Sequence, residues 1–499
     1  MTVDRLATRV GERLFPDPSR VVARLFVPGQ ELLAGNESRA SGVVERILSL
    51  DDAEVERALA SVMQRFAPRH RALTEVFSLH ADRISNRISD DVTLSESRRL
   101  LLGATFTHEF AIEAAALCNP SVVAHPDQRS APPGGLRFVM SVRGIGEGHR
   151  SSIGFRTGSI GTDGSVTIDT AGSFPTTGSL AAGPFDRAVF HGRLFEIGAD
   201  GENAAYVLDA LGGQFTDSEL DLALKRLRAQ RDTRRTAGKT SRHLRAIAAC
   251  SYTTEFPVAT DISERVLWPA TTAEAQGMED ARFVRFENDD GTSVYYATYT
   301  AFDGVAITQQ LLETNDFVTF TASPIVGAAA GNKGLALFPR RIGGRFAALS
   351  RCDRETNSIA FSDNPRCWGD AVTVQHPVEP WETIQLGNCG SPIETSEGWL
   401  VLTHGVGPMR TYSIGALLLD LDDPTVIIGR LHEPLLVPAR DEQDGYVPNV
   451  VYSCGALLHA DTLVIPYGIG DSAIGIATVP VAPLLAALHA GHAMRSVLN

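Results

Sequence analysis

The sequence has few cysteines, and they are spaced in a way that excludes two common kinds of small-domain stabilisation. Its 499 residues include only 6 cysteines, which lie far apart and form no Cys-x-x-Cys pair. Neither a structural zinc site nor a disulfide framework is therefore expected. A reducing, cytoplasmic environment is the simplest expectation from this cysteine usage.

The sequence also lacks long apolar segments. The N-terminus has no basic start followed by an apolar stretch, so no secretory leader is expected. The longest uncharged stretch is Ser472–Met494, which Pro480 and Pro483 interrupt. A buried strand that leads into a terminal helix over 481–499 explains this stretch better than a membrane span does.

Basic residues are in deficit, with 45 lysines and arginines against 59 aspartates and glutamates and a formal net charge of −14. Binding to nucleic acid or to an anionic membrane surface requires clustered positive charge, so neither partner is expected. The composition, 43% hydrophobic and 21% charged, is otherwise that of an ordinary globular protein. The charge count does not restrict a neutral substrate.

Residues 1–115 are predicted to form a helical N-terminal region. The segments 51–77 and 94–117 carry apolar residues at helical spacing together with many good helix formers. Ser95 and Ser97 are suitable residues for the start of the second of these helices.

Residues 116–480 are predicted to form an all-β domain. Short β-type runs alternate with turn residues, and the expected hairpin turns are Gly134-Gly135, Asp290-Gly291, Gly343-Gly344, Glu397-Gly398 and Ala460-Asp461. The last four follow one another at intervals of roughly 50 to 60 residues, which is typical of four-stranded propeller blades. The predicted fold class is a five-bladed β-propeller with a helical N-terminal region and a helical insertion.

The helical insertion is expected at about 214–250. Thr216 and Glu219 have the spacing of a capping box at the start of a helix. The following segment is strongly basic and contains Lys225, Arg226, Arg228, Arg231, Arg234, Arg235, Lys239, Arg242 and Arg245. A solvated helix face or a subunit contact is the simpler interpretation, and binding of an anionic ligand is the alternative.

Few familiar catalytic motifs are present. Gly144, Gly146 and Gly148 have the wrong spacing and no following helix for a dinucleotide loop. Neither His-Glu-x-x-His nor Gly-x-Ser-x-Gly occurs. The most informative motif is Glu279-Asp280-x-Arg282 before a predicted strand, which on spacing alone is more typical of a turn with a salt bridge than of a catalytic site.

Other polar residues stand at the starts or ends of predicted strands, where a propeller would bring them to one mouth. These residues are Lys333, Arg351, Glu394, His404 and Asp471. Each has a structural explanation when taken singly, whereas the set together favours a polar ligand site.

Several segments resemble glycoside hydrolase family 130, a family of five-bladed β-propellers that phosphorolyse or hydrolyse β-mannosides with inversion. The segments that carry the resemblance are 277–286, 295–304, 332–351, 390–407 and 447–472. Weaker similarity begins at 118–128 and 137–155, so about three-quarters of the chain is covered.

The resemblance implies roles for individual residues. Asp280 corresponds to the general acid, which passes its proton to the glycosidic oxygen through a sugar hydroxyl. The positions that resemble those lining the mannose subsite are Asn119, Arg143, Asp303 and Asp471. Glu279, Arg282 and Tyr299 are further predicted substrate-binding residues, Tyr299 as a stacking platform for the sugar. Those that resemble a phosphate site are Lys333, Arg351 and His404.

One position departs from the pattern of the phosphorylases. Many of them have Pro-Pro-Ile-Lys where this sequence has Ser391-Pro-Ile-Glu394. A carboxylate repels a phosphate dianion, but it suits the general base of an inverting hydrolase, which acts on a water opposite the acid. Glu394 is therefore predicted to be the base, with Glu442 and Asp444 as weaker candidates.

The sequence-based expectation is an enzyme that cleaves β-mannosidic linkages with inversion, and a hydrolase is the first choice. The alternatives are a β-mannoside phosphorylase, a glycosyltransferase type of reaction that releases mannose 1-phosphate, and a non-catalytic carbohydrate-binding propeller. No metal and no organic cofactor is expected, and inorganic phosphate is the co-substrate if the enzyme is a phosphorylase. The expected partner is an oligosaccharide or mannoside, and the basic insertion allows a homo-oligomer.

Overall fold

A computed structural model describes residues 6–29, 38–89, 91–230 and 232–498. By contact density the chain divides into two units, one made of residues 1–16, 115–171 and 177–499 and the other of residues 17–114 and 172–176. The larger unit is mostly β-sheet and carries the predicted site residues. The smaller unit is mostly helical.

Five groups of antiparallel strands follow one another along the larger unit. The first two groups consist of β4 (Ala116–Ala124), β5 (Leu136–Ile145), β6 (Ser151–Ile160) and β7 (Val166–Ile168), and of β14 (Gly277–Glu287), β15 (Ser293–Phe302), β16 (Ile307–Thr314) and β17 (Thr319–Pro324). β13 (Arg265–Leu267) pairs with β6, and β12 (Tyr252–Glu255) extends the second group from β17 to β9 (Ser179–Ala182).

The other three groups come from the second half of the chain and its N-terminus. The third group consists of β18 (Ala336–Leu337), β19 (Phe346–Ser350), β20 (Asn357–Ser362) and β21 (Val372–Gln375). The fourth consists of β22 (Gln385–Asn388), β23 (Ile393–Thr395), β24 (Gly398–Val406), β25 (Tyr412–Leu419) and β26 (Ile427–Arg430). The fifth consists of β27 (Val451–Tyr452), β28 (Leu457–His459), β29 (Thr462–Ile469), β30 (Ala473–Pro480) and β1 (Thr8–Leu14).

The five predicted hairpin turns are confirmed, because each joins two paired antiparallel strands. Local chemistry explains them. Gly291, Gly343 and Gly344 have φ values of 81°, 56° and 79°, a region that glycine adopts without steric cost. Asp290 accepts a hydrogen bond from the backbone N–H of Thr292, which closes its turn.

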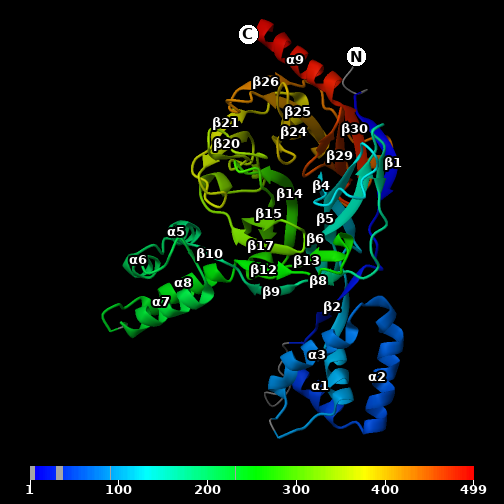
Figure 1. Ribbon diagram of the computed structural model, residues 1–499, viewed down its shortest axis with the longest axis vertical. Coiled ribbons are helices and arrows are strands. Elements are labelled where there is room, and N and C mark those ends of the chain that lie inside the picture. Colours follow the sequence, from blue (N-terminus) through cyan, green and yellow to red (C-terminus); the bar gives the residue numbers. More distant parts are fainter. Residues whose placement is uncertain (1–5, 30–37, 90, 231, 499) are drawn as a thin grey trace. The chain divides into compact units, whose positions relative to one another are not determined.

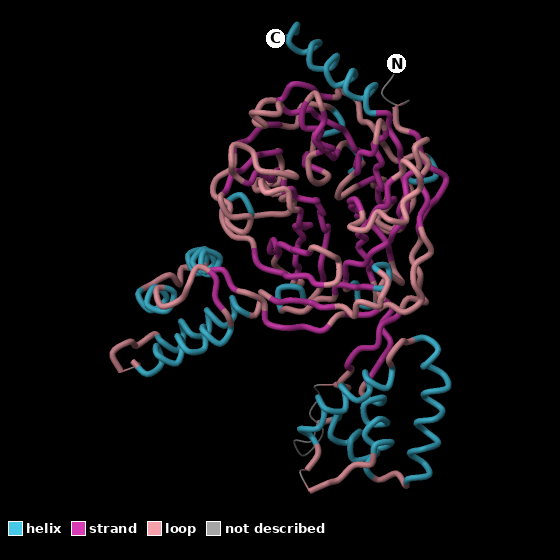
Figure 2. The backbone as a smooth tube through the Cα atoms, in the orientation of Figure 1, coloured by secondary structure: helices cyan, strands magenta, loops and turns pink. Residues whose placement is uncertain are grey.

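Consecutive strand groups share buried apolar clusters, and the last group packs against the first. Separate clusters join the first group to the second, the second to the third, the third to the fourth and the fourth to the fifth. Ile474 and Ile476 of β30 then pack with Phe138 and Met140 of β5. In Figure 1 the five groups accordingly succeed one another around a common centre, and strands make up most of this ring in Figure 2.

The helical insertion begins earlier in the sequence than predicted. It contains α5 (Arg187–Glu196), α6 (Glu202–Leu208), α7 (Asp217–Ala229) and α8 (Ala237–Ala248), with the short pair β10 (Phe185–Asp186) and β11 (Gln214–Phe215). The capping box of Thr216 and Glu219 is confirmed. The first helices were missed because Phe185, Phe190 and Phe215 pack against one another across this segment, a contact that no local spacing reveals.

The prediction of a helical region over 1–115 needs correction at its start and its edges. β1 pairs with β30 and completes the fifth strand group. The smaller unit contains β2 (Val21–Leu25) paired with β3 (Thr107–Ala111), and the helices α1 (Arg39–Leu48), α2 (Asp52–Phe66), α3 (Leu73–Ile84) and α4 (Glu96–Thr105). Ser95 caps α4 as predicted.

The chain ends in α9 (Val481–Leu498), which packs against β26 of the fourth group. Among the described helices, none combines the length and the apolar character that crossing a membrane requires. Arg231, which belongs to the predicted basic cluster, lies outside the described residues.

Candidate active site

Two β-bulges bring Asn119 and Asp280 together. The register between β4 and β5 shifts after Cys118, and the register between β14 and β15 shifts between Glu279 and Arg282. Asn119 and Asp280 occupy these shifts with φ values of 48° and 55°, which non-glycine residues seldom adopt. The side-chain amide of Asn119 donates a hydrogen bond to Oδ1 of Asp280. Strained backbone at both ends of one contact is typical of a functional site.

The neighbouring carboxylate, Glu279, is held between two cations. Its Oε1 accepts a hydrogen bond from Nη2 of Arg143 at 2.7 Å, and its Oε2 accepts one from Nζ of Lys333 at 2.6 Å. Nη1 of Arg143 also lies 3.7 Å from Oδ1 of Asp280. Glu279 and Asp280 are 7% and 8% exposed, so both charges are compensated within a nearly dry cluster.

Arg282 supports the same cluster from within the protein. Its Nη1 donates to the backbone carbonyl of Asp280 at 2.9 Å, and its Nη2 donates to the hydroxyl of Tyr452 at 2.8 Å. Burial acts to lower the pKa of Arg282, but the surrounding groups, Tyr452 and Asp280 among them, leave that pKa above its ordinary value. Arg282 is therefore a permanent positive charge behind Asp280.

Asp280 and Asp471 differ in their affinity for protons. Burial acts to raise the pKa of Asp280, while Arg143 and Lys333 oppose burial and leave that pKa below its ordinary value. Burial also acts on Asp471, and here it prevails, so the pKa of Asp471 lies above its ordinary value. Arg143 opposes this rise and Asp280 adds to it. Without further ligands, Asp471 therefore binds a proton more readily than Asp280 does.

Arg351 and His404 form a second contact beside the cluster. Nδ1 of His404 lies 3.1 Å from the carbonyl oxygen of Asn388, and its Nε2 lies 2.9 Å from Nη1 of Arg351. A carbonyl only accepts, so Nδ1 carries the proton and Nε2 accepts from Arg351. Burial and then Arg351 hold the pKa of His404 well below its ordinary value. His404 is thus a neutral imidazole that orients Arg351.

Tyr452 connects the two parts of the site and was not singled out from the sequence. Its ring lies edge-on to that of His404 with centroids 4.9 Å apart, and its hydroxyl accepts from Arg282. Tyr452 lies on β27, which is two residues long. A strand of this length is too short to show any periodicity in the sequence. The only available indication was its place within a segment that resembles the family.

The structure therefore brings together most of the predicted residues. Asn119, Arg143, Glu279, Asp280, Arg282 and Lys333 are in direct contact with at least one other member of the set. Arg351 and His404 join through Tyr452, and Asp471 acts on Arg143 and Asp280 through its charge. Three buried arginine nitrogens of this set, the Nε atoms of Arg143, Arg282 and Arg351, have no hydrogen-bond acceptor among the described residues.

Glu394 is not part of this cluster, and its prediction as general base is corrected. Its two carboxylate oxygens accept from Nη2 and Nε of Arg340 at 2.7 and 2.9 Å. The backbone of Arg340 in turn forms an isolated β-bridge with that of Glu287, at the far end of β14. Seven residues of strand separate Glu287 from Asp280, or roughly 20 Å. An inverting pair is separated by only roughly 6.5 to 9.5 Å.

Two of the predicted sugar-binding residues make structural contacts away from this cluster. Tyr299 is fully buried and donates its hydroxyl to Glu274, so it belongs to the core. Asp303 accepts from the backbone N–H groups of Val305 and Ala306, both at 2.7 Å, and closes the turn after β15. Sequence spacing could not separate a ligand contact from either role.

The structure also bears on the two weaker candidates for the general base, Glu442 and Asp444. Glu442 is fully buried and accepts from Nη2 of Arg9 at 2.9 Å and from the hydroxyl of Tyr467 at 2.7 Å. This carboxylate ties β1 to β29 and has no free face for a water. Asp444 makes no contact with Asp280 among the described residues.

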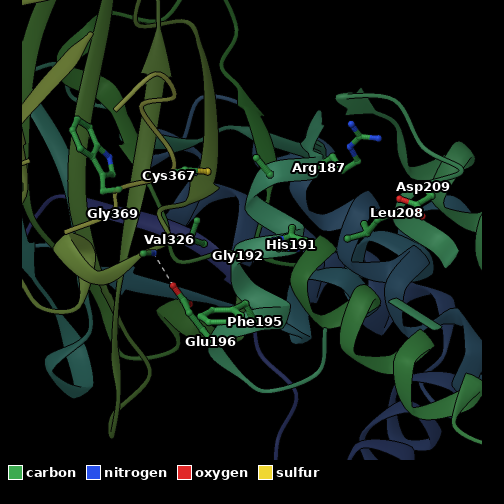
Figure 3. A pocket seen from close by; sticks show the side chains of 13 residues that line it. Arg187, His191, Gly192, Phe195, Glu196, Leu208, Asp209, Val326, Cys367 and Gly369 are labelled. Atoms are coloured by element: carbon green, nitrogen blue, oxygen red, sulfur yellow. Dashed lines mark hydrogen bonds between the residues drawn. The ribbon is translucent and has the colours of Figure 1, made fainter. Parts of the chain in front are cut away.

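A cavity elsewhere in the larger unit is a poor alternative site. It encloses about 560 Å³ and lies between α5 and the segments around Val326 and Trp368 (Figure 3). Glu196, one of its carboxylates, already accepts from the backbone N–H of Gly327 at 2.8 Å. None of the predicted site residues lines this cavity.

Comparison with known proteins agrees with the resemblance. The model of a family described as beta-1,4-mannooligosaccharide phosphorylase matches residues 252–489. A 1,2-beta-oligomannan phosphorylase of Thermoanaerobacter sp. (strain X514) is 34% identical over 223 residues, which cover 43% of this chain and 72% of the relative. A beta-1,2-mannobiose phosphorylase of Listeria innocua is 31% identical over 227 residues, 44% of this chain and 62% of the relative.

A beta-1,4-mannooligosaccharide phosphorylase of Ruminococcus albus is 36% identical over 162 residues, 30% of this chain and 48% of the relative. Among solved structures, that of the Listeria innocua beta-1,2-mannobiose phosphorylase in complex with beta-1,2-mannobiose aligns with 76% of this chain and 93% of its own. The sequence identity is 20% and the TM-score is 0.44. Asn119 and Arg143 precede the part of the chain that the family model matches.

Proposed function

The chain belongs to glycoside hydrolase family 130, and from this membership we propose that it is an inverting phosphorylase of short β-mannosides. The observation that carries the proposal is the arrangement of charges around Asp280. Lys333, Arg143 and Arg282 contact the acidic pair, and Arg351 joins them through His404 and Tyr452, whereas Glu394 is held by Arg340 at the other end of β14. A nucleophile that is itself an anion suits this arrangement better than a water that needs a base.

In the proposed reaction a phosphate oxygen attacks the anomeric carbon of the mannosyl residue from the face opposite the leaving sugar. The bond between the anomeric carbon and the glycosidic oxygen breaks as the new carbon–oxygen bond forms, so a β-mannoside gives α-mannose 1-phosphate. Asp280 supplies the proton of the leaving oxygen through a sugar hydroxyl. Overall, the proton of hydrogen phosphate ends on the released sugar, and the atoms balance without a cofactor.

Phosphate also helps to make Asp280 an acid. With Lys333 and Arg143 uncompensated by a ligand, the pKa of Asp280 lies below its ordinary value. A phosphate dianion beside these cations adds negative charge near the carboxyl, and a nearby like charge favours the protonated form. Binding of the nucleophile thus prepares the acid that the same step requires.

The hydrolase, which was the first expectation from the sequence, is less well supported. Glu394, its predicted general base, is hydrogen-bonded to Arg340. The three relatives described above are named as phosphorylases. A non-catalytic carbohydrate-binding domain would not explain why a strained, buried acid faces three cations. The relatives are named for both β-1,2 and β-1,4 linkages, so the proposal extends to either type of mannobiose.

The proposal includes the architecture. The five strand groups, each packed on the next and the last on the first, are interpreted as the blades of a closed five-bladed β-propeller. β1 closes the ring by pairing with β30. In such a fold the strands nearest the axis converge, which explains how Asn119, Asp280 and His404 come from different groups.

A pair of variants tests the assignment of the acid. Asp280→Asn is expected to lower kcat on β-mannobiose in phosphate buffer by at least about a hundredfold, because the amide cannot supply the proton. The matched control is Glu394→Gln, which is expected to stay within about twofold of the native enzyme. A large loss in Glu394→Gln with little loss in Asp280→Asn would refute the proposed roles.

A further inference from the structure

The helical insertion contains a second polar cavity that the proposed reaction does not use. It encloses about 460 Å³ between the loop that precedes α6 and the first turns of α8. Its lining is largely polar and includes Asn203, Thr233, Arg235, Lys239, Thr240 and His243. This volume lies within the range of small-molecule sites.

Two cations of this cavity are free of carboxylate partners. Neither Arg235 nor Lys239 forms an ion pair with any carboxylate in the described part of the chain. Both side chains are exposed. The neighbouring Arg234, in contrast, already has hydrogen-bond partners. Arg234 donates to Glu202 at 2.8 Å and to Asn203 at 3.1 Å, and its guanidinium lies 4.3 Å from the centroid of the Tyr206 ring. Arg234 therefore connects residues of the cavity wall to one another. Arg235 and Lys239 supply the net positive charge of the cavity.

The first turn of α8 adds one hydroxyl to the same wall. Thr236, the residue before the helix, does not cap it with its side chain, because its hydroxyl accepts from Nδ2 of Asn203 at 2.8 Å. The backbone N–H groups of Ala237 and Lys239 in this turn already donate to the carbonyl oxygens of Arg234 and Thr236. Thr240, one turn along, lines the cavity with only 8% of its surface exposed. Its hydroxyl makes no hydrogen bond to another described residue.

We propose that this cavity binds the phosphate group of a small sugar phosphate monoester. A phosphate dianion offers three acceptor oxygens, which match the two unpaired cations and the Thr240 hydroxyl. The remaining volume is bordered by Asn203, Thr233 and His243, whose side chains can bond sugar hydroxyls. The site uses only residues of the insertion and does not depend on the proposed reaction.

Calorimetric titration of the full chain with mannose 1-phosphate tests the proposal. All titrations use a Lys333→Gln background, which weakens phosphate binding at the catalytic cluster. One site is expected in this background, and additional replacement of Lys239 by Gln is expected to weaken it by at least about tenfold. The matched control is Arg242→Gln on the exposed side of α8, which does not line the cavity and should leave the affinity within about twofold.

Three results would overturn the proposal: no binding in the Lys333→Gln background, equal affinity with and without Lys239, or equal binding of uncharged mannose. A second variant, Thr240→Val, should weaken binding without lowering the melting temperature, which separates loss of the site from loss of the fold. Phosphorolysis of mannobiose is measured separately with the native chain, so failure of the catalytic proposal is distinguishable from failure of this one.

Discussion

Asp280 and Asn119 meet because each occupies an irregular position in its strand. A regular β-strand alternates its side chains between two faces, and a bulge redirects one of them. The motif Glu279-Asp280-x-Arg282 was visible in the sequence, and so was its resemblance to a family. The bulge was not visible, because it depends on the register of β14 against β15. The resemblance therefore predicted which residues would come together, and the structure supplied the reason.

Glu394 shows where residue-level reasoning fails. Its replacement of a lysine was a real departure from the phosphorylase pattern, and a carboxylate is a reasonable base. The sequence could not show that Arg340 reaches it with two hydrogen bonds, or that Arg340 lies over the ring of Trp399 at 4.8 Å. Arg340 and Glu394 are 54 residues apart in the sequence, so their contact depends on how the third and fourth strand groups pack.

His404 is expected to act through Arg351 rather than on phosphate directly. Replacing it by Phe removes the acceptor for Nη1 of Arg351 and leaves that guanidinium without orientation. The expected result is an increase of about tenfold in KM for phosphate, with KM for mannobiose changed less than about twofold. Steady-state kinetics with each substrate varied in turn measures both values. An unchanged KM for phosphate would show that His404 does not orient the phosphate site.

At the scale of elements, local chemistry made the hairpins predictable and left β1 unpredictable. Turn residues such as Asp290-Gly291 determine their own conformation. β1, in contrast, pairs with residues more than 450 positions away, as Thr8 does with Thr478. Its mixed polarity gives no clear alternation. A strand of this kind forms because its partner strand is present, which the local sequence does not show. For this reason the sequence-based prediction extended the helical region to residue 1 and missed β1.

The contact between Arg9 and Glu442 is expected to hold β1 in place. Arg9→Ala leaves the fully buried Glu442 carboxylate with Tyr467, backbone partners and a single longer ion pair to Arg13, whose Nη2 lies 3.7 Å from Oε1. The free energy of unfolding should fall by about 2 kcal/mol, less than for a fully buried pair because Arg9 is about one-third exposed. Urea denaturation measures this change.

The matched control for Arg9 is Arg129→Ala, which removes an exposed pair with Asp127. An exposed pair contributes less than about 1 kcal/mol, so this variant should unfold much like the native chain. Equal losses in the two variants would show that the buried carboxylate does not secure the strand.

Stability of the smaller unit is expected to depend on pH through His80 of α3. Burial and then Arg83 lower the pKa of His80 to about 4. An unfolded histidine binds a proton below a pKa of about 6.5, whereas the folded one stays neutral down to about 4. Stability is therefore complete above pH 6.5 and declines between about 6.5 and 4.

The measurement is urea unfolding of the native chain and of His80→Gln at pH 7 and pH 5. The native chain should lose about 2 kcal/mol more than the variant between these values, from 1.36 kcal/mol per unit over about 1.5 units. If both proteins respond equally to pH, His80 does not carry this dependence.

At the scale of the whole molecule, the sequence indicated an acidic protein with one basic segment, and the structure shows two places where basic side chains converge. One set surrounds Asp280, and the other lines the cavity of the insertion. The overall charge of −14 made polyanionic partners unexpected, but it gave no reason against a small anion that binds a few converging cations. The choice between hydrolysis and phosphorolysis depends on that local distribution, which only the folded chain displays.

The measurement that tests the central claim most directly is product analysis of β-mannobiose cleavage in matched buffers with and without phosphate. NMR of the phosphate-containing reaction should show mannose and α-mannose 1-phosphate in equal amounts, and the phosphate-free reaction should show no cleavage. Release of two molecules of mannose at the same rate in both buffers would contradict the account.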